Sequence, residues 1–349
     1  MSRAIDIGGR TIGDGRPCFV IAEAGVNHNG DVALAEQLIE AAHDAGADCV
    51  KFQTWITEKV VAPTAPLVGY QARTGATATS QFELLKPLEL SYEDFRALKA
   101  YADSRGIVFL ATPDEEGSAD FLESLGVVAF KISSAEVTNL PFVRHVACKG
   151  RPVILSTGMS SLEEVERAVA AVEEEGNREL VLLQCVSSYP ANPEDVNLRA
   201  MDTLASLGYP VGFSDHTLGI DVALAAVARG ACVLEKHLTL DRSLDGPDHA
   251  ASIEPAELAQ LVRSVRRVEA ALGDGVKRIT DGERESRKAL QKVVVTRRML
   301  RAGEVITDAD VTLLRADAGL PPESLDWVVG RRAARDVAAH SALTADLVV

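Results

Sequence analysis

The sequence lacks the segments that would direct a chain into or across a membrane. Its first ten residues, MSRAIDIGGR, contain no apolar stretch of the kind found in a secretory signal. No uninterrupted apolar run is long enough to span a bilayer. We therefore expect a cytoplasmic protein that has no membrane partner.

Paired cysteines are also missing. The five cysteines are an odd number, and no two of them stand in a CxxC motif. Four of them, Cys18, Cys49, Cys185 and Cys232, lie in or at the start of apolar, strand-like runs. This placement predicts reduced, buried thiols, as in a cytoplasmic protein, and it excludes a disulfide framework.

An excess of positive charge is the third absence. The chain has 36 Lys and Arg against 51 Asp and Glu, which gives a net charge of −15. Such a charge argues against nucleic acid or an anionic membrane as a partner. A small anionic ligand is compatible with it only where the binding site is locally basic.

Eight short apolar runs alternate with amphipathic, helix-like segments. The runs cover residues 18–25, 48–54, 107–113, 128–134, 152–158, 179–185, 210–216 and 232–238. Continuously apolar strands separated by helices are typical of a parallel sheet covered by helices. Eight such units in about 250 residues predict an α/β fold of the (β/α)₈, or TIM-barrel, type. The first run is not followed by GxGxxG, so a Rossmann fold is not indicated.

Two segments interrupt this alternation. More than thirty residues separate position 54 from the helix expected near Ser91, and such a long connection predicts a lid over the barrel. The charged segment GDGVKRITDGERESRK then ends the barrel. We predict a catalytic barrel over 1–272, a linker over 273–290 and a small β-rich domain over 291–349. A domain of about 60 residues is near the lower limit of independent stability, so it is expected to dock on another surface.

Polar side chains gather where the predicted strands end, the position of the chemistry in barrel enzymes. Two lysines, Lys51 and Lys131, stand there among hydroxyl groups, a combination suited to a phosphate and a carboxylate. The hydroxyl residues are Thr112, Ser134, Ser156 and Ser214. A structural alternative is that the lysines pair with Glu23 and Glu136 and only stabilise the barrel.

Two histidines follow neighbouring strands at matching points, His216 in GFSDHTLG and His237 in VLEKHLTL. Adjacent strands lie about 5 Å apart, so both imidazoles can reach one divalent cation. Such a site leaves positions open for a substrate, as Lewis-acid catalysis requires. An ordinary hydrogen-bonded histidine pair is the alternative interpretation.

A set of motifs in order along the chain resembles the sialic acid synthase family. The matching segments are IAEAGVNHNGD, VKFQT, FKISSAE, ILSTGM, SSYPANPEDVNL, GFSDHTLG, EKHLTLD and GPDHAASIEP. The C-terminal RAGEVITDADVTLLRADAG resembles the antifreeze-like (SAF) domain of that family, which has a β-clip fold. The resemblance implies condensation of phosphoenolpyruvate with N-acetylmannosamine or a related hexose.

The resemblance also implies a role for each matching residue. His216 and His237 would bind one Mn²⁺- or Mg²⁺-type ion, and Glu23 would act as an acid or base near the reacting carbon. Phosphoenolpyruvate would be held by Lys51, Thr112, Lys131, Ser134, Ser156, Ser187 and Ser214. The sugar would be held by Gln53, Glu136, Tyr189 and Asp248.

In that family the small domain of one subunit covers the barrel of its partner in a domain-swapped homodimer. The resemblance therefore implies that Arg315 completes the sugar site of a second copy of the chain. The sequence departs from the family pattern around this residue, with LRADAG in place of KRPGxG. It also departs at Asp114, where phenylalanine often stands, and both changes concern the sugar rather than the chemistry.

The sugar itself is left open by the sequence. The segment from APLVGYQARTG to SQFELLKPLELS is closer to bacterial members that use unphosphorylated N-acetylmannosamine or a diacetamido-trideoxy hexose. The second sugar type would make the enzyme a legionaminate or pseudaminate synthase. Two rival functions are a Schiff-base aldolase, with Lys131 or Lys236 as the nucleophile, and a non-catalytic sugar-binding protein.

Overall fold

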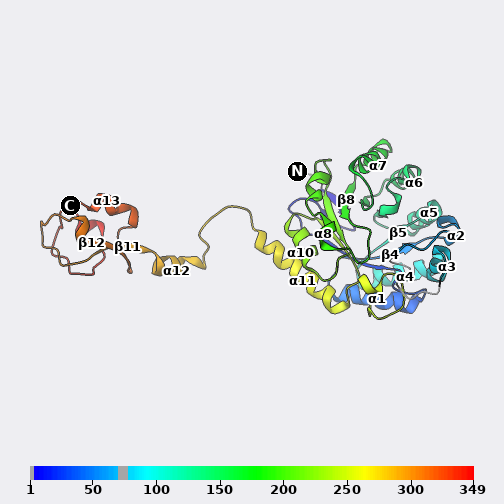
Figure 1. Cartoon of the computed structure of the whole chain (residues 1–349), viewed down its shortest axis with the longest axis horizontal. Helices are drawn as coiled ribbons and strands as arrows, with labels where there is room; N and C mark the ends of the chain where they lie inside the picture. Colours follow the sequence, from blue (N-terminus) through cyan, green and yellow to red (C-terminus); the bar gives the residue numbers. More distant parts are fainter. Residues whose placement is uncertain (1–3, 70–77) are drawn as a thin grey trace. The chain divides into compact units, whose positions relative to one another are not determined.

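The computed structural model describes residues 4–69 and 78–349. The chain divides into two compact units, Met1–Gly273 and Asp274–Val349 (Figure 1). Each unit has its own hydrophobic core. The candidate site lies in the first unit, which is described first.

Eight parallel strands form the centre of the first unit. Their hydrogen-bonded order is β5-β4-β3-β10-β9-β8-β7-β6. The two end strands, β5 and β6, also lie next to each other, so the sheet is a nearly closed barrel. The strands are β3 (Phe19–Gly25), β4 (Cys49–Thr54), β5 (Val108–Pro113), β6 (Phe130–Ile132), β7 (Val153–Ser156), β8 (Leu180–Cys185), β9 (Val211–Asp215) and β10 (Val233–His237).

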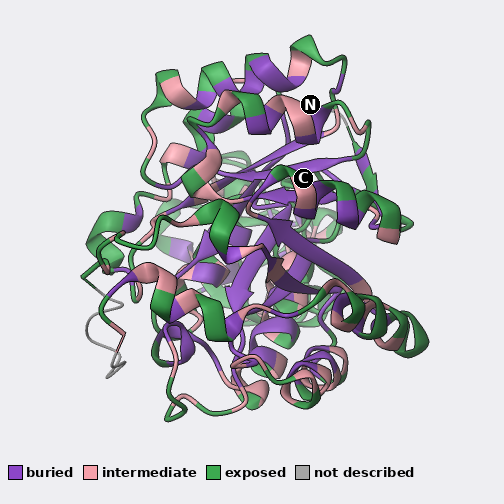
Figure 2. Ribbon diagram, turned by 90° about the vertical axis from the view of Figure 1, so that its right-hand side faces the viewer, coloured by how far each residue is buried: buried purple, intermediate pink, exposed green. Residues whose placement is uncertain are grey.

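Helices surround this barrel on its outer side, and Figure 2 shows that their buried faces turn toward the buried strands. They are α1 (Val32–Asp44), α4 (Tyr92–Arg105), α5 (Glu116–Leu125), α6 (Leu140–Ala147), α7 (Leu162–Glu174), α8 (Pro193–Val196), α9 (Ala200–Ala205), α10 (Asp221–Ala228) and α11 (Pro255–Leu272). Several begin at a residue whose side chain binds the free backbone N–H groups of the first turn. Ser91 and Ser161 each start a reciprocal capping box, at α4 and α7.

All eight apolar runs predicted from the sequence are strands, and the predicted (β/α)₈ fold is confirmed. Most strand ends differ from the predicted ends by one or two residues. The reason for the agreement is that each strand is buried on both faces, so its apolar run is continuous.

A β-hairpin that the sequence interpretation missed precedes the barrel. Strands β1 (Ile5–Ile7) and β2 (Arg10–Ile12) pair in antiparallel fashion around Gly8 and Gly9. Both glycines have positive φ, 61° and 82°, as a two-residue hairpin turn of this kind requires. The sequence IDIGGRTI, which alternates apolar and polar residues around Gly-Gly, carried this signal.

The hairpin fills the N-terminal end of the barrel. Its three isoleucines, Ile5, Ile7 and Ile12, belong to one buried cluster with inward-facing residues such as Ile21 and Leu110. This apolar plug keeps water out of one end of the barrel. The opposite end, where the strands terminate, is left for polar side chains.

The connection after β4 contains two short helices, α2 (Thr57–Val60) and α3 (Gln81–Leu85), and a 3₁₀ turn, η2 (Lys86–Leu88). Trp55 and Leu88 pack together with Val26 in a small buried cluster. Residues 70–77, in the middle of the predicted lid, lie outside the described residues. The lid therefore stays a prediction.

The second unit is a small β-rich body. It contains α12 (Glu283–Leu290), the antiparallel pair β11 (Lys292–Thr296) and β12 (Val311–Arg315), and α13 (Leu325–Val328). Its core includes Val294, Leu300, Ile306 and Leu343. The helix α12 lies in the segment predicted as a linker, and residues 270–292 are all exposed. Among the described residues of both units, no helix is long and apolar enough to cross a membrane.

The plug generates a test of stability. We expect Ile7→Ala to lower the free energy of unfolding of the barrel by about 2–4 kcal/mol, because the fully buried side chain leaves a cavity. Scanning calorimetry would measure the barrel transition. The exposed Thr11 on the same hairpin supplies the control, Thr11→Ala. Equal effects of the two substitutions would show that the hairpin is no part of the barrel core.

Candidate active site

Strand alternation decides which side chains enter the mouth of the barrel, meaning the C-terminal ends of its strands. On β10, Glu235 points inward, because its carboxylate contacts Lys51 and Lys131. His237, two residues further, shares that face, and Lys236 takes the opposite one. The mouth therefore receives an acid and an imidazole from a single strand.

Lys51 lies at the centre of a buried set of contacts. Its Nζ atom is 2.7 Å from Glu23 Oε2, 3.6 Å from Glu235 Oε2, and donates to Thr112 Oγ1 at 2.9 Å. Burial lowers the pKa of Lys51, but the two carboxylates outweigh burial and raise it. This lysine is therefore a fixed positive charge.

Lys131 is the second buried cation. Its Nζ atom donates to Ser156 Oγ at 2.7 Å and is 3.8 Å from Glu235 Oε1. Burial lowers its pKa, and the more distant Glu235 only partly offsets this effect. Lys131 thus lacks a close carboxylate partner, which leaves its charge available to an anion.

Glu235 joins the two lysines, although the sequence interpretation gave it no role. Its Oε1 atom accepts a hydrogen bond from Ser214 Oγ at 2.9 Å. Burial would raise its pKa, but Lys131 and Lys51 outweigh burial and lower the pKa to about 2. The alternation of VLEKHL was the signal, because Glu235 lies on the same strand face as His237.

The structure supports only part of the alternative in which Lys51 and Lys131 pair with Glu23 and Glu136. Lys51 does pair with Glu23, but Glu136 bonds instead to Asn139, with 2.6 Å between Asn139 Nδ2 and Glu136 Oε2. The ion pairs leave the two lysines balanced by two carboxylates, Glu23 and Glu235. Glu23 is the less firmly ionised of these acids, since burial raises its pKa to about 7 even though Lys51 opposes the rise.

His216 and His237 meet in the mouth, as their matched positions predicted. Their ring centres are 5.3 Å apart and their planes are nearly perpendicular. His216 Nδ1 is 2.7 Å from the Val186 carbonyl oxygen, which only accepts, so Nδ1 carries a proton and Nε2 is the atom that can bind a cation. His237 is buried, and its Nδ1 atom has no hydrogen-bond partner; the nearest carboxylate oxygen, Asp248 Oδ2, is 3.6 Å away.

This arrangement fits a divalent cation. Two imidazoles bound to one ion at about 2.1 Å place their ring centres about 5 Å apart. A carbonyl that holds the other ring nitrogen, as Val186 does for His216, is the usual outer support of a ligand histidine. Burial lowers the pKa of His237 well below its ordinary value, so this imidazole is neutral, as a ligand must be.

His216 behaves differently in the absence of a cation. Burial lowers its pKa, but Cys185 and the Val186 carbonyl raise it to about 9. A cation that binds Nε2 must therefore displace a proton. Cys185 Sγ lies 3.8 Å from His216 Nδ1, so this predicted packing cysteine borders the site.

A buried ion pair on the outer face of the barrel fixes the two histidines at one height. Lys236 Nζ is 2.7 Å from Asp215 Oδ2, and both side chains are inaccessible to solvent. The two residues are direct partners in the β9–β10 register. Asp215 also accepts hydrogen bonds from the backbone and hydroxyl of Thr217, which shapes the turn around His216. Because Lys236 faces away from the mouth, it is no candidate for a Schiff-base nucleophile.

The side chains of two serines lie against the loop that follows β7. Ser134 Oγ accepts a hydrogen bond from Gly158 N at 3.0 Å. A Cβ atom at Gly158 would overlap the hydroxyls of Ser134 and Ser187, so glycine is required for this close approach. The structure thus brings Ser134 and Ser187 together beside the strand that carries Ser156.

Of the residues predicted for the sugar, Gln53, Glu136 and Tyr189 are partly exposed, whereas Asp248 is buried. Gln53 donates to Glu23 Oε1 at 3.2 Å, and the ring of Tyr189 stacks on His216 with 4.1 Å between ring centres. Asp248 is buried next to His237. Arg315 ends β12 in the second unit, where it is exposed.

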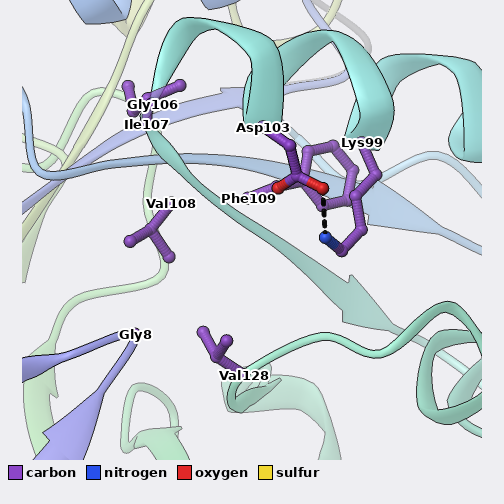
Figure 3. Close-up of a pocket in the computed structure, with 8 residues that line it drawn as sticks. All are labelled: Gly8, Lys99, Asp103, Gly106, Ile107, Val108, Phe109 and Val128. Atoms are coloured by element: carbon purple, nitrogen blue, oxygen red, sulfur yellow. Dashed lines mark hydrogen bonds and ion pairs between the residues drawn. The ribbon is translucent and has the colours of Figure 1, made fainter.

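Other features of the first unit are poorer candidates. A cavity of about 250 Å³ lies at the opposite end of the barrel. Figure 3 shows the residues that line it, among them Gly8, Val108 and Val128. Its only charged side chains, Lys99 and Asp103, already form an ion pair at 2.7 Å. A group of metal-ligand side chains on α1, Glu40, His43 and Asp44, lies outside the barrel and is partly exposed.

Fold and site together define a barrel protein whose mouth contains two buried lysines and two histidines, followed by a small β-rich unit. Residues 38–277 match the model of the NeuB family, and residues 291–349 match that of the SAF domain. The chain belongs to the NeuB family, the family of sialic acid synthases, and carries a C-terminal SAF domain. The resemblance noted in the sequence is confirmed.

Relatives with established names cover almost the whole chain. It is 47% identical over 336 residues to the N,N'-diacetyllegionaminic acid synthase of Legionella pneumophila, which covers 95% of this chain and 94% of that protein. It is 40% identical over 327 residues to the human N-acetylneuraminate-9-phosphate synthase, with coverage of 93% and 90%. The N-acetylneuraminic acid synthetase structure from Leptospira borgpetersenii superposes with a TM-score of 0.72 at 39% identity, over 83% of this chain and 98% of that one.

The outer ion pair yields a test of its structural role. We expect Lys236→Met to lower the free energy of unfolding by about 3–5 kcal/mol, because the buried Asp215 carboxylate would lose its cationic partner. Lys99→Met is the matched control, because it breaks a 2.7 Å Lys–Asp pair at the surface, worth about 0–1 kcal/mol. Urea denaturation would measure both. Similar losses in the two variants would contradict this account of the β9–β10 register.

Proposed function

We propose that the protein condenses phosphoenolpyruvate with an open-chain 2-acetamido hexose, N-acetylmannosamine or a close relative, and water. The products are a nonulosonic acid and inorganic phosphate. The observation that carries this proposal is the buried Lys51–Glu235–Lys131 set directly beside the two histidines. Membership of the NeuB family supports it.

Phosphoenolpyruvate would bind at the two lysines. Lys131, which lacks a close carboxylate, attracts the anion, and hydroxyls that line the same wall donate to its oxygens. The hydroxyl donors would be Thr112, Ser134, Ser156 and Ser187, together with Ser214 if its hydroxyl turns from Glu235 Oε1 to the anion. Burial of the Lys131 ammonium group without a close carboxylate is costly, so a bound anion would stabilise it even in a chain of net charge −15.

His216 and His237 would hold one Mn²⁺- or Mg²⁺-type cation. When bound, the cation polarises the sugar aldehyde and makes its carbon electrophilic. Tyr189 restricts the movement of His216 by stacking on it. Both histidines lie next to the lysine pair, so the aldehyde carbon would face the methylene carbon of phosphoenolpyruvate.

The new carbon–carbon bond joins that methylene carbon to the aldehyde carbon, and the aldehyde oxygen takes up a proton. Water then adds to the electron-poor enol carbon and loses a proton, and the carbon–oxygen bond to phosphate breaks to leave a ketone. Glu23 would exchange these protons, because burial raises its pKa to about 7 and both of its forms then exist near neutral pH. The lysines stabilise the anionic charge throughout.

Gln53, Glu136, Tyr189 and Asp248 would hold the sugar. The names of the relatives divide over its identity, because the bacterial synthase at 47% identity makes diacetyllegionaminic acid and the human synthase at 40% makes a phosphorylated product. The first of these supports a diacetamido-trideoxy hexose as the second candidate acceptor. The buried free cysteines support a cytoplasmic location for the reaction.

A homodimer in which the SAF domain covers the barrel of the partner would complete the site. The small second unit follows an exposed, charged segment and needs a docking surface. A mouth that holds a reactive intermediate also needs protection from water. Arg315 would then bind the sugar with its planar guanidinium group.

Phosphate release tests the function directly. We expect the protein to release phosphate from phosphoenolpyruvate in the presence of N-acetylmannosamine or the diacetamido-trideoxy hexose, and EDTA to abolish this release. His216→Ala and His237→Ala should abolish turnover and cation binding, the latter measured by calorimetry, and leave the folded barrel intact. Resistance to EDTA, with an imine trapped by borohydride and pyruvate, would instead favour the aldolase. Release with none of the acceptors would favour a sugar-binding protein.

Mixing two inactive variants tests the trans arrangement. Arg315→Ala and His237→Ala proteins are each expected to be inactive, and the mixture should regain activity after subunit exchange. One of the two sites in each mixed dimer would have an intact barrel and an intact arginine. Mass spectrometry of labelled subunits would verify the exchange. Verified exchange without recovery would show that the arginine acts in its own chain or has no role.

A further inference from the structure

The mouth contains a carboxyl group that the proposed chemistry does not use, that of the partly buried Asp114. The backbone N–H of Asp114 donates to the Thr54 carbonyl oxygen at 3.1 Å and so continues the β4–β5 ladder. Thr112, two residues earlier, points into the barrel, because Lys51 donates to its hydroxyl. By strand alternation Asp114 points the same way, one layer closer to the solvent.

Charges on neighbouring elements agree with this direction. Burial and the Glu136 carboxylate raise the pKa of Asp114 to about 7, while Lys51 and Lys131 pull it down. Both lysines therefore act electrostatically on Asp114. Glu136 belongs to the short 3₁₀ helix η3 (Ser134–Glu136) that follows β6, the strand next to β5.

A third carboxyl group, Asp248, closes this layer on the other side, where it lies 3.6 Å from His237 Nδ1. That ring nitrogen is buried and has no hydrogen-bond partner, as expected of a position that awaits a ligand. The outer layer of the mouth is thus bounded by Asp114, Glu136 and Asp248, and the lysines and histidines lie beneath it.

Positive charge is scarce around this layer. Six described loops at the mouth contain no Lys or Arg, namely residues 26–31, 114–115, 133–139, 157–161, 186–192 and 216–220. After β10, Arg242 is already paired with Glu254 and Glu257. In the described part of the loop after β4, Lys59 and Lys86 are paired with acids as well. Arg315, placed as proposed above, adds one positive charge against three carboxyl groups.

We infer that Asp114, with Glu136 and Asp248, forms an acceptor subsite that takes an uncharged sugar and excludes a phosphorylated one. This inference rests on the proposed function. The acceptor's aldehyde end must reach the histidines, so the rest of the sugar has to lie in the outer layer. Carboxyl oxygens accept hydrogen bonds from hydroxyl and acetamido N–H groups, whereas a phosphate dianion is repelled.

The experiment compares kcat/KM for N-acetylmannosamine, its 6-phosphate and 2,4-diacetamido-2,4,6-trideoxymannose. For the unaltered protein we expect kcat/KM for the phosphate ester to be at least 100-fold lower than kcat/KM for the better of the two uncharged sugars. This ratio tests the inference without any substitution. A phosphate ester that is used as well as the free sugars would overturn it.

Asp114→Asn keeps the shape of the side chain and removes its charge. We expect this substitution to raise kcat/KM for the phosphate ester, so that the ratio of kcat/KM for the uncharged sugar to that for the ester falls at least tenfold. The control, Asp44→Asn, removes an exposed charge of α1 far from the mouth and should leave the ratio unchanged. An unchanged ratio in a folded Asp114→Asn protein would overturn the role of Asp114.

Binding separates failure of the subsite from failure of the proposed reaction. Calorimetry would measure the dissociation constants of N-acetylmannosamine and its 6-phosphate directly. If no acceptor releases phosphate from phosphoenolpyruvate, the proposed reaction is wrong, and weaker binding of the ester than of the free sugar would still support the subsite. Equal or tighter binding of the ester would refute the subsite whether or not turnover occurs.

Discussion

The contact of two buried lysines with one buried carboxylate organises the mouth of this barrel. Glu235 lies within 3.6 Å of Lys51 and 3.8 Å of Lys131, and it fixes both cations in a region that water does not reach. The nearly solvent-free surroundings strengthen every charge interaction there. The same surroundings separate the acids, since Glu235 stays ionised with a pKa of about 2 while that of Glu23 rises to about 7. Strand alternation thus decides which charged side chains enter the mouth, and their burial and mutual distances set the pKa of each acid.

Distant parts of the first unit support this arrangement. The isoleucines of the β1–β2 hairpin close the N-terminal end of the barrel, so polar groups are confined to the other end. On the outer face, the Lys236–Asp215 pair holds β9 and β10 in register, and this register sets His216 beside His237. One strand thus carries a structural lysine between two residues of the site.

Some features were predictable from particular residues. The eight strands are buried on both faces, so their runs are mostly apolar and the strand positions followed from this pattern, and parallel strands place their polar ends at one edge. Lys51, Lys131, His216 and His237 were found in this way. The hairpin was missed because its signal, two short alternating segments around Gly8 and Gly9, is weak beside the long apolar runs. The role of Glu235 in the motif EKHLTLD could not be predicted, because spacing alone does not reveal which carboxylate meets which lysine.

The sequence by itself determined the barrel, its family and the residue types in the mouth, because these depend on local pattern and motif order. Only the tertiary structure decided which charges pair. Lys51 meets Glu23 across neighbouring strands, Lys236 turns outward to Asp215, and Glu136 leaves the lysines to bind Asn139. The role proposed for Asp114 also depends on the three-dimensional structure, because it rests on the direction of its side chain and on the influence of the Glu136 carboxylate. Pairing and burial arise between segments far apart in the chain, and the energies of buried charges depend on those distances.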